Sequence, residues 1–219
     1  RHFNTPVTGG SVSFYKQRAN PDGSAQALFP TPTIGKVGVM ENSAHHTGLD
    51  FKEKGELIFL LGGSSGCINA SEYLANIVGI DRSPAPQFDL EEEGKLHACL
   101  REVAQKGVAA ASHDVADGGL FITLLEMAMP NGLGFDIVTD DEVRLDGFLF
   151  GEGQGRAVVS IKEEDQDDFF DVCEKHGKQP MLLGHVTKGK LVVDEKHFGF
   201  SEELRAYYDN ALEEMLTED

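Results

Sequence analysis

The sequence predicts an α+β fold in which a mixed sheet packs against helices. Short apolar segments alternate with longer amphipathic ones along the 219 residues, and the last two apolar segments, 181–186 and 191–193, are separated only by a turn at Lys188 and Gly189. This hairpin-like end and the irregular loops argue against a doubly wound parallel sheet. We expect the α+β domain to comprise residues 34–219, and residues 1–33 to be the remnant of a preceding domain.

Strands are expected where apolar residues are continuous or alternate with polar ones. The clearest is 57–61, whose continuous run of leucine, isoleucine and phenylalanine is typical of a buried strand. The other expected strands are 11–14, 34–40, 108–111, 133–138, 157–161, 181–186 and 191–193.

Five segments carry apolar residues at helical spacing, and three of them begin at a capping residue. Asp89 followed by Glu92 forms a capping box for a helix that Gly107 ends. Ser71 and Ser201 can cap two other helices. The expected helices are 71–78, 90–106, 120–128, 163–176 and 201–216. The apolar face expected for the last helix consists of Leu204, Tyr207, Tyr208 and Leu212.

Charge and cysteine content restrict the class of protein. The chain has 19 Lys and Arg against 37 Asp and Glu, a formal net charge of −18, which argues against non-specific nucleic-acid binding because that binding depends on cationic side chains. No apolar run reaches the roughly 18 residues needed to cross a bilayer, so we expect no membrane partner. Cys67, Cys99 and Cys173 share no close spacing and are expected to be reduced, in a cytoplasmic protein. The chain starts on a segment that looks mid-domain, so we expect a longer polypeptide.

The segment 111–120 places an acidic, glycine-containing turn between an expected strand and an expected helix. Such a turn can direct carboxylates, an imidazole and backbone N–H groups at one point, an arrangement suited to phosphate or a metal-bound phosphate. The alternative is that Asp117 only caps the helix and the glycines only permit a tight turn. The candidate ligand-binding residues here are His113, Asp114, Asp117, Gly118 and Gly119.

Two further glycine-containing segments carry polar side chains that can contact a ligand. After Gly10, Ser11 and Ser13 lie on one side of an expected strand, where their hydroxyls can contact phosphate or a metal-bound water. The alternative is an ordinary glycine turn that enters a strand. In the second segment, three polar residues alternate with glycines and share one side of a flexible stretch: Glu152, Gln154 and Arg156.

Five segments occur together in a fixed order: 5–15 (TPVTGGSVSFY), 31–38 (TPTIGKVG), 71–74 (SEYL), 113–120 (HDVADGGL) and 150–156 (FGEGQGR). Together they resemble the C-terminal third of the synthetase subunit of phosphoribosylformylglycinamidine synthase, a family within the aminoimidazole ribonucleotide synthetase-like superfamily. The similarity covers essentially all 219 residues.

This resemblance implies an ATP-dependent carbon-nitrogen ligase of purine biosynthesis. The family converts formylglycinamide ribonucleotide to formylglycinamidine ribonucleotide with ATP, Mg²⁺ and ammonia that a glutaminase partner delivers. The resemblance implies that Gly10 contacts ATP, Ser11 binds magnesium and Ser13 contacts the substrate. The family's catalytic histidine and most of its metal-binding carboxylates belong to N-terminal domains outside this sequence. We therefore expect no catalytic residue here, and a fragment that is inactive alone.

The resemblance also predicts the two parts of the chain. Residues 1–33 resemble the end of an ATP-binding-type domain, and residues 34–219 resemble a C-terminal synthetase-type domain. The turn at His113 and the side chains of Glu152, Gln154 and Arg156 are expected to border a second, pseudosymmetric and non-catalytic site.

The chain departs from the family pattern at several positions. The family has asparagine where this chain has Ser11, and the shorter hydroxyl puts a direct metal bond in doubt. Residues 16–17 and 69–70 also differ from the family's Asn-Glu and Gly-Gly pairs. An alternative hypothesis is therefore a nucleotide-binding or assembly module without catalysis. A third is another member of the superfamily, such as a selenophosphate synthetase or a thiamine-monophosphate kinase.

Overall fold

The computed structural model describes residues 2–10, 17–28, 31–63 and 66–217. Its internal contacts divide the chain between Ser43 and Ala44 into two units, which we describe separately. The domain boundary that we expect between residues 33 and 34 concerns a longer polypeptide and stays a prediction.

The first unit contains an exposed hairpin formed by β1 (Gln17–Ala19) and β2 (Ala25–Ala27). In its turn the Asn20 N–H donates to the Ser24 carbonyl at 2.8 Å. The strand expected at 34–40 does not form, and its apolar side chains are exposed, with Val37 at 100%. A strand needs a pairing partner, and this segment has none among the described residues of its own unit. The strand expected at 11–14, with Ser11 and Ser13, lies outside the described residues.

The second unit is built on a seven-stranded mixed sheet with the strand order β4-β6-β3-β7-β5-β8-β9. All neighbouring strands are antiparallel except β5 and β8, which are parallel. This confirms the predicted α+β class with a mixed sheet. The strands are β3 (Leu57–Leu61), β4 (Ala111–Asp114), β5 (Gly134–Ile137), β6 (Ala157–Ile161), β7 (Met181–Thr187), β8 (Lys190–Val193) and β9 (Lys196–Phe200).

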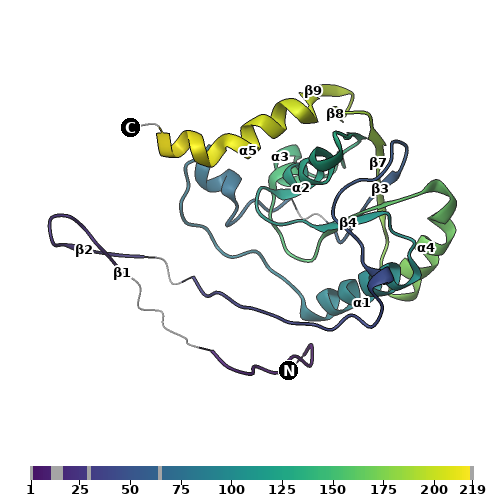
Figure 1. Ribbon diagram of the computed structural model, residues 1–219, viewed down its shortest axis with the longest axis horizontal. Helices are drawn as coiled ribbons and strands as arrows, with labels where there is room; N and C mark the ends of the chain where they lie inside the picture. The colour runs from purple at the N-terminus through teal and green to yellow at the C-terminus, as the bar shows by residue number, and fades with distance from the viewer. Residues whose placement is uncertain (1, 11–16, 29–30, 64–65, 218–219) are drawn as a thin grey trace. The chain divides into compact units, whose positions relative to one another are not determined.

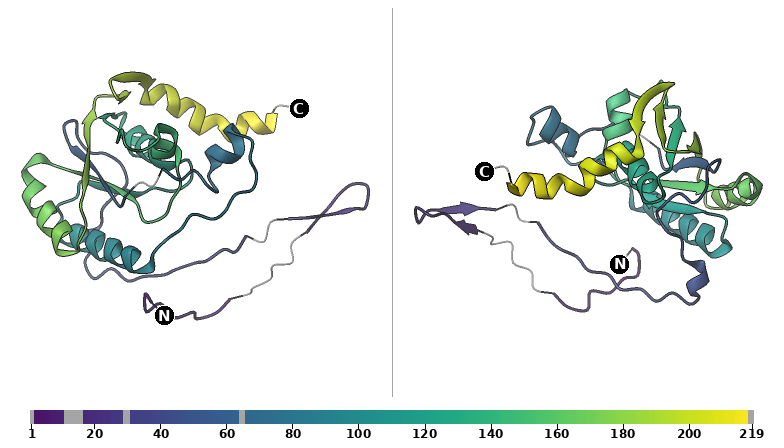
Figure 2. Two further views of the ribbon diagram at one scale, coloured as in Figure 1. Left: turned by 180° about the vertical axis from the view of Figure 1, so that it is seen from behind. Right: turned by 45° about the horizontal axis from the view of Figure 1, so that its top comes forward.

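Helices cover both faces of this sheet. The α-helices are α1 (Leu90–Lys106), α2 (Gly119–Ala128), α3 (Leu145–Phe150), α4 (Gln166–Lys175) and α5 (Ser201–Thr217). Short helical turns occur at η1 (Ser43–His45), η2 (Tyr73–Ile77), η3 (Met129–Asn131) and η4 (Glu163–Asp165). Figures 1 and 2 show α1 and α4 together on one side of the sheet, and α2 and α3 together on the other. No helix in the described ranges is long and apolar enough to cross a membrane.

The inner strand β3 contributes side chains to two hydrophobic cores, one on each face of the sheet. Ile58 and Leu60 belong to the core beneath α2 and α3, whereas Phe59 and Leu61 belong to the core beneath α1 and α4. Because successive side chains of a strand point to opposite faces, a continuous apolar run fits a strand that is covered on both sides.

The predicted caps of α1 are confirmed. The Asp89 carboxylate accepts hydrogen bonds from the N–H groups of Glu91 and Glu92, at 2.8 and 3.2 Å, and Gly107 ends the helix with a φ of +69°. The helix expected at 71–78 is shorter, a single π-helical turn at η2. Ser71 nevertheless acts as a cap there, since its hydroxyl accepts the Leu74 N–H at 3.1 Å.

The structure corrects the expected pairing and bounds of several strands. β7 and β8 do not form a hairpin, because β5 lies between them and pairs with both. The hairpin partner of β8 is β9, which the sequence analysis missed, and a turn at Asp194 and Glu195 with positive φ values connects them. The strand expected at 108–111 instead begins at Ala111 and continues through polar residues, as an edge strand can.

The expected apolar face of α5 is largely exposed. Tyr207 and Leu212 are each 70% exposed, and Tyr208 is 52% exposed. Leu204, in the first turns of the helix, packs against the core. The last helix forms as predicted. Most of its expected apolar face is not buried within this unit.

Candidate functional site

The sheet topology brings three loops to one end, and two of them, around residues 113 and 152, are predicted to contact a ligand. Leu61 at the end of β3 and Asp114 at the end of β4 both pair with Ala157, the first residue of β6. The loops that follow β3 and β4 therefore leave the sheet where the loop 151–156 enters it. The polar segments around residues 113 and 152, far apart in sequence, are placed near each other by this register.

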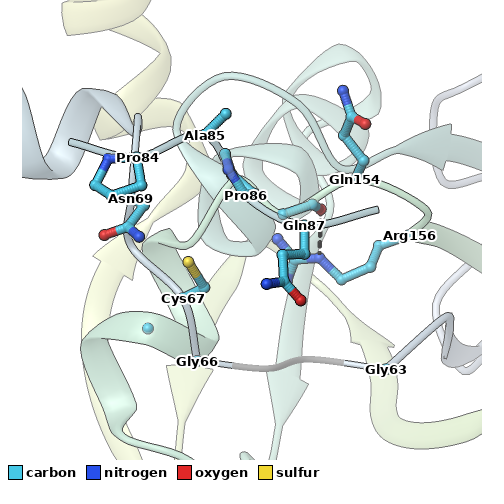
Figure 3. A pocket seen from close by; sticks show the side chains of 12 residues that line it. Gly63, Gly66, Cys67, Asn69, Pro84, Ala85, Pro86, Gln87, Gln154 and Arg156 are labelled. Carbon is cyan, nitrogen blue, oxygen red and sulfur yellow. Dashed lines mark hydrogen bonds between the residues drawn. The ribbon is translucent and has the colours of Figure 1, made fainter. Parts of the chain in front are cut away.

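A cavity of about 470 Å³ lies between the segment that follows β3 and the loop that precedes β6. Cys67 and Asn69 line it from the segment after β3, the extended segment 84–87 lines it ahead of α1, and Gln154 and Arg156 line it from the loop before β6. Figure 3 shows Asn69 and Cys67 on one side of the cavity and Gln154 and Arg156 on the other, with Gln87 between them. The cavity thus offers amide and guanidinium groups beside glycine backbone.

The close approach of two loops beneath the cavity requires glycine. Gly62 has a φ of +86°, and a Cβ atom at this position would collide with the carbonyl oxygen of Gly155. Any other residue is disfavoured at position 62 for two reasons: the positive φ is unfavourable for a residue with a side chain, and there is no space for a Cβ atom. The glycine-rich composition of both loops therefore has a structural reason independent of any ligand.

Arg156 is a buried cation in the wall of the cavity. The residue is 5% exposed, and its Nε donates to the Gly153 carbonyl at 3.0 Å while a terminal nitrogen donates to the Gly151 carbonyl. Burial lowers the pKa of the guanidinium, and the charge of Glu152 opposes this shift. Within the described part of the chain no carboxylate lies within ion-pairing distance of Arg156. Glu152 is therefore a nearby negative charge that forms no ion pair with Arg156, and an anionic ligand in the cavity would find a buried positive charge in its wall.

Glu152 does not line the cavity; its carboxylate connects two neighbouring segments of the chain. Its Oε1 accepts the Gly118 N–H at 2.8 Å and the Glu72 N–H at 2.9 Å. Gly118 is the N-cap residue of α2 and has a φ of +81°, so the carboxylate also lies at the positive end of that helix. The stacking of Tyr73 on Phe150, with ring centroids 5.3 Å apart, strengthens the same connection. The sequence contained no signal for this bridge.

The polar side chains of the turn after β4 have different partners, although Nδ1 of His113 lies 3.2 Å from Oδ1 of Asp114. His113 is turned toward α2, where its Nε2 lies 3.2 Å from Oε2 of Glu126, and Asp114 is 79% exposed. Asp117 is exposed and Gly118 is the N-cap residue of α2, so the alternative in which Asp117 caps the helix was wrong. The reason is that Gly118 occupies the N-cap position and the carboxylate of Glu152 satisfies its N–H. The Gly119 N–H donates to the Ala116 carbonyl at 3.0 Å.

The other predicted site residues belong to the first unit. Gly10 is exposed, and Ser11 and Ser13 lie outside the described residues, so their roles stay predictions. Among the residues that the structure describes, no group of three His, Cys, Asp or Glu side chains is arranged to hold a metal ion. These residues by themselves do not fit a magnesium site.

The chain matches one family model. The model describes the C-terminal domain of AIR synthase related proteins and matches residues 53–196. The chain therefore belongs to this family. The match covers the whole sheet up to the first residue of β9, including the loops around the cavity.

Curated relatives of this AIR synthase-related domain are PurL subunits of phosphoribosylformylglycinamidine synthase. The chain is 36% identical to the subunit from Moorella thermoacetica over 189 residues, which are 86% of this chain and 25% of that protein. It is 35% identical to the subunit from Zymomonas mobilis over 218 residues, which are 99% of this chain and 29% of that protein. The chain thus spans less than a third of the length of these relatives.

Solved structures support the fold. PurL from Thermotoga maritima complexed with FGAR superposes with a TM-score of 0.62 at 14% identity, covering 75% of this chain and 30% of that one. The complex of the same protein with ATP gives a TM-score of 0.59 at 14% identity, with 74% and 27% covered. At this level of identity the likeness concerns the fold.

Proposed function

We propose that this chain is the C-terminal part of a PurL-type phosphoribosylformylglycinamidine synthase. The complete enzyme would convert formylglycinamide ribonucleotide, ATP and ammonia to formylglycinamidine ribonucleotide. The observation that carries the proposal is the 35% identity to the Zymomonas mobilis subunit along 99% of the chain. Thermotoga maritima PurL has been solved in complexes with FGAR and with ATP, which agrees with these substrates.

The remaining parts of the enzyme would come from elsewhere. We propose that the N-terminal domains of the same polypeptide supply the catalytic residues, and that a glutaminase subunit delivers the ammonia. The chain's small share of its relatives' length supports the first statement, and the PurLQS structure from Thermotoga maritima, with a TM-score of 0.54, agrees with the second. A cytoplasmic location is part of this proposal, and the free thiols of Cys67, Cys99 and Cys173 agree with it.

Magnesium belongs to the same proposal, through Ser11 together with carboxylates of the missing domains. The described residues offer no metal site of their own. Gly10 would contact ATP and Ser13 the ribonucleotide, as the family resemblance implies.

The cavity beside Arg156 would serve as the second, non-catalytic site. We propose that it holds the phosphate groups of a nucleotide, with Arg156 supplying positive charge and Gln154 an amide. Support comes from the buried guanidinium without a carboxylate partner and from a volume of about 470 Å³, which is in the range of small-molecule sites. Glu152 would act indirectly here, because it holds the neighbouring loops in place.

Activity of the longer polypeptide tests the ligase proposal. We expect release of ADP that depends on both formylglycinamide ribonucleotide and an ammonium salt, and no such release from the 219-residue chain. A longer polypeptide that binds ATP but releases no ADP with this substrate would overturn the ligase proposal. That outcome would favour the alternative of a nucleotide-binding or assembly module.

Calorimetric titration with ATP tests the cavity. In the longer polypeptide, Arg156→Met is expected to weaken ATP binding at this site at least about tenfold, since it removes a charged contact. Gln154→Ala, at an exposed position, tests the amide with little risk to folding. Arg101→Met, at an exposed position on α1, removes the same charge away from the cavity and is the matched control. Equal affinities for all four proteins would exclude this cavity as the site.

A further inference from the structure

Two cysteine thiols face each other between the helices that cover one side of the sheet. Cys99 lies on α1 and Cys173 lies on α4, and their Sγ atoms are 3.8 Å apart. Both residues are 0% exposed and are surrounded by the core that includes Phe169 and Val172. They are 74 positions apart in the sequence, so only the folded structure reveals this pair.

Ionic contacts hold α1 and the end of α4 together around the thiols. Glu102, one turn after Cys99, contacts Lys175 at 2.7 Å and His176 at 2.8 Å. Near the start of α1, Glu92 contacts Lys178 at 2.9 Å. Ion pairs therefore join α1 to α4 and the residues that follow it, both before and after Cys99 in the sequence, and they hold the two sulfur atoms close together.

The surroundings of the two sulfur atoms differ. The contact with the Cys173 thiol and the positive charge of Lys178 lower the pKa of the Cys99 thiol. The same contact and burial raise the pKa of Cys173. The positive charge of Lys178 near Cys99 favours the thiolate of that residue, which is the nucleophilic form, and Cys173 is positioned to react with it next.

We propose that Cys99 and Cys173 form a reversible disulfide when the protein meets a peroxide, which cross-links α1 to α4. The Cys99 thiolate attacks one peroxide oxygen, the O–O bond breaks, and the sulfur becomes a sulfenic acid while hydroxide leaves and takes up the thiol proton as water. The Cys173 sulfur then attacks the Cys99 sulfur. The S–O bond breaks, and the second water leaves with the Cys173 proton. Two thiols are oxidised and one peroxide is reduced to two waters.

The sulfur atoms must move closer to react. A disulfide bond is about 2.05 Å long. The two Sγ atoms are 3.8 Å apart, so they must approach each other by about 1.7 Å before the bond can form. Because both thiols are buried, the peroxide reaches them when the α1 and α4 contact opens. We therefore expect this pair to react more slowly than Cys67, which is partly exposed.

Mass spectrometry of the Cys67→Ala variant tests the proposal, since only the pair then remains. After hydrogen peroxide treatment in native buffer, removal of peroxide, denaturation and maleimide labelling, we expect a mass lower by two hydrogen atoms and no label. Dithiothreitol should restore two labels. Cross-linking should also raise the midpoint of thermal unfolding by roughly 5 °C or more, because it closes a long loop in the unfolded chain.

The double variant Cys99→Ser/Cys173→Ser, which keeps Cys67, is the matched control for oxidant activity. If both thiols of Cys67→Ala still take the label after peroxide treatment that lasts many times longer than complete oxidation of Cys67 in this control, the proposal is overturned. Conversion of the pair to sulfinic acids, without a cross-link, overturns it as well. The wild-type chain provides a check that requires no variant, because trypsin should release peptide 96–101 linked to peptide 163–175.

Discussion

Replacement of Glu152 by alanine tests whether its carboxylate fixes the loops of the cavity. In the native chain one oxygen of this side chain accepts the N–H groups of Gly118 and Glu72. The first of these bonds is partly buried and the second is exposed, so the two losses differ in size. The Glu152→Ala variant leaves the partly buried N–H of Gly118 without its charged acceptor.

The expected loss of stability follows from these two bonds. A partly buried N–H that loses a charged acceptor costs about 1.5 kcal/mol, and an exposed one that water can satisfy costs about 0.5 kcal/mol. We therefore expect Glu152→Ala to lower the free energy of unfolding by about 2 kcal/mol. In Glu152→Gln an amide oxygen can still accept both bonds, so the loss is limited to the charge at the start of α2, about 0.5 kcal/mol.

Urea unfolding followed by circular dichroism measures these differences. Glu164→Ala, at an exposed position, is a control for the loss of one surface carboxylate and should stay within about 0.5 kcal/mol of the wild type. Hydrogen exchange should be faster at the Gly118 amide in Glu152→Ala than in Glu152→Gln. The reasoning would be refuted by an alanine variant as stable as the wild type, or by a glutamine variant that loses as much as the alanine variant.

Three further changes have defined outcomes. Asp117→Ala should change the free energy of unfolding by less than about 0.5 kcal/mol, because the exposed carboxylate does not cap α2; a loss above 1 kcal/mol in urea unfolding would contradict this. Gly62→Ala should cost about 2 kcal/mol or more, whereas Gly107→Ala, with positive φ but open space, should cost about 1 kcal/mol; equal losses would argue against the collision at Gly62. The contact with Lys175, and to a smaller extent the contact with His176, lowers the pKa of Glu102 from 4.5 to about 2. The Glu102 carboxylate therefore stabilises the folded state fully above pH 4.5, and this contribution disappears as the pH falls through about 2. The difference in urea midpoint between wild type and Glu102→Gln should therefore shrink over this pH range, and a constant difference would contradict it.

Local patterns were sufficient for most secondary structure of the second unit. The run 57–61 is apolar at every position because β3 is covered on both faces, and this information is present in the segment itself. Asp89 and Gly107 marked the ends of α1 because capping depends on residues within one turn of the helix end. The predictions that failed concerned the partners of a segment. The alternating apolar residues of 34–40, for example, have no neighbouring strand in the described part of their own unit.

The sequence by itself determined the fold class, the ends of α1, the buried strands and the order of the glycine-containing loops. Only the tertiary structure decided which groups meet. The insertion of β5 between β7 and β8, the bridge from Glu152 to Gly118 and the contact of Cys99 with Cys173 all join residues far apart in the chain. The physical reason is that hydrophobic periodicity and capping are local properties, whereas strand pairing and side-chain contacts depend on how the elements pack together.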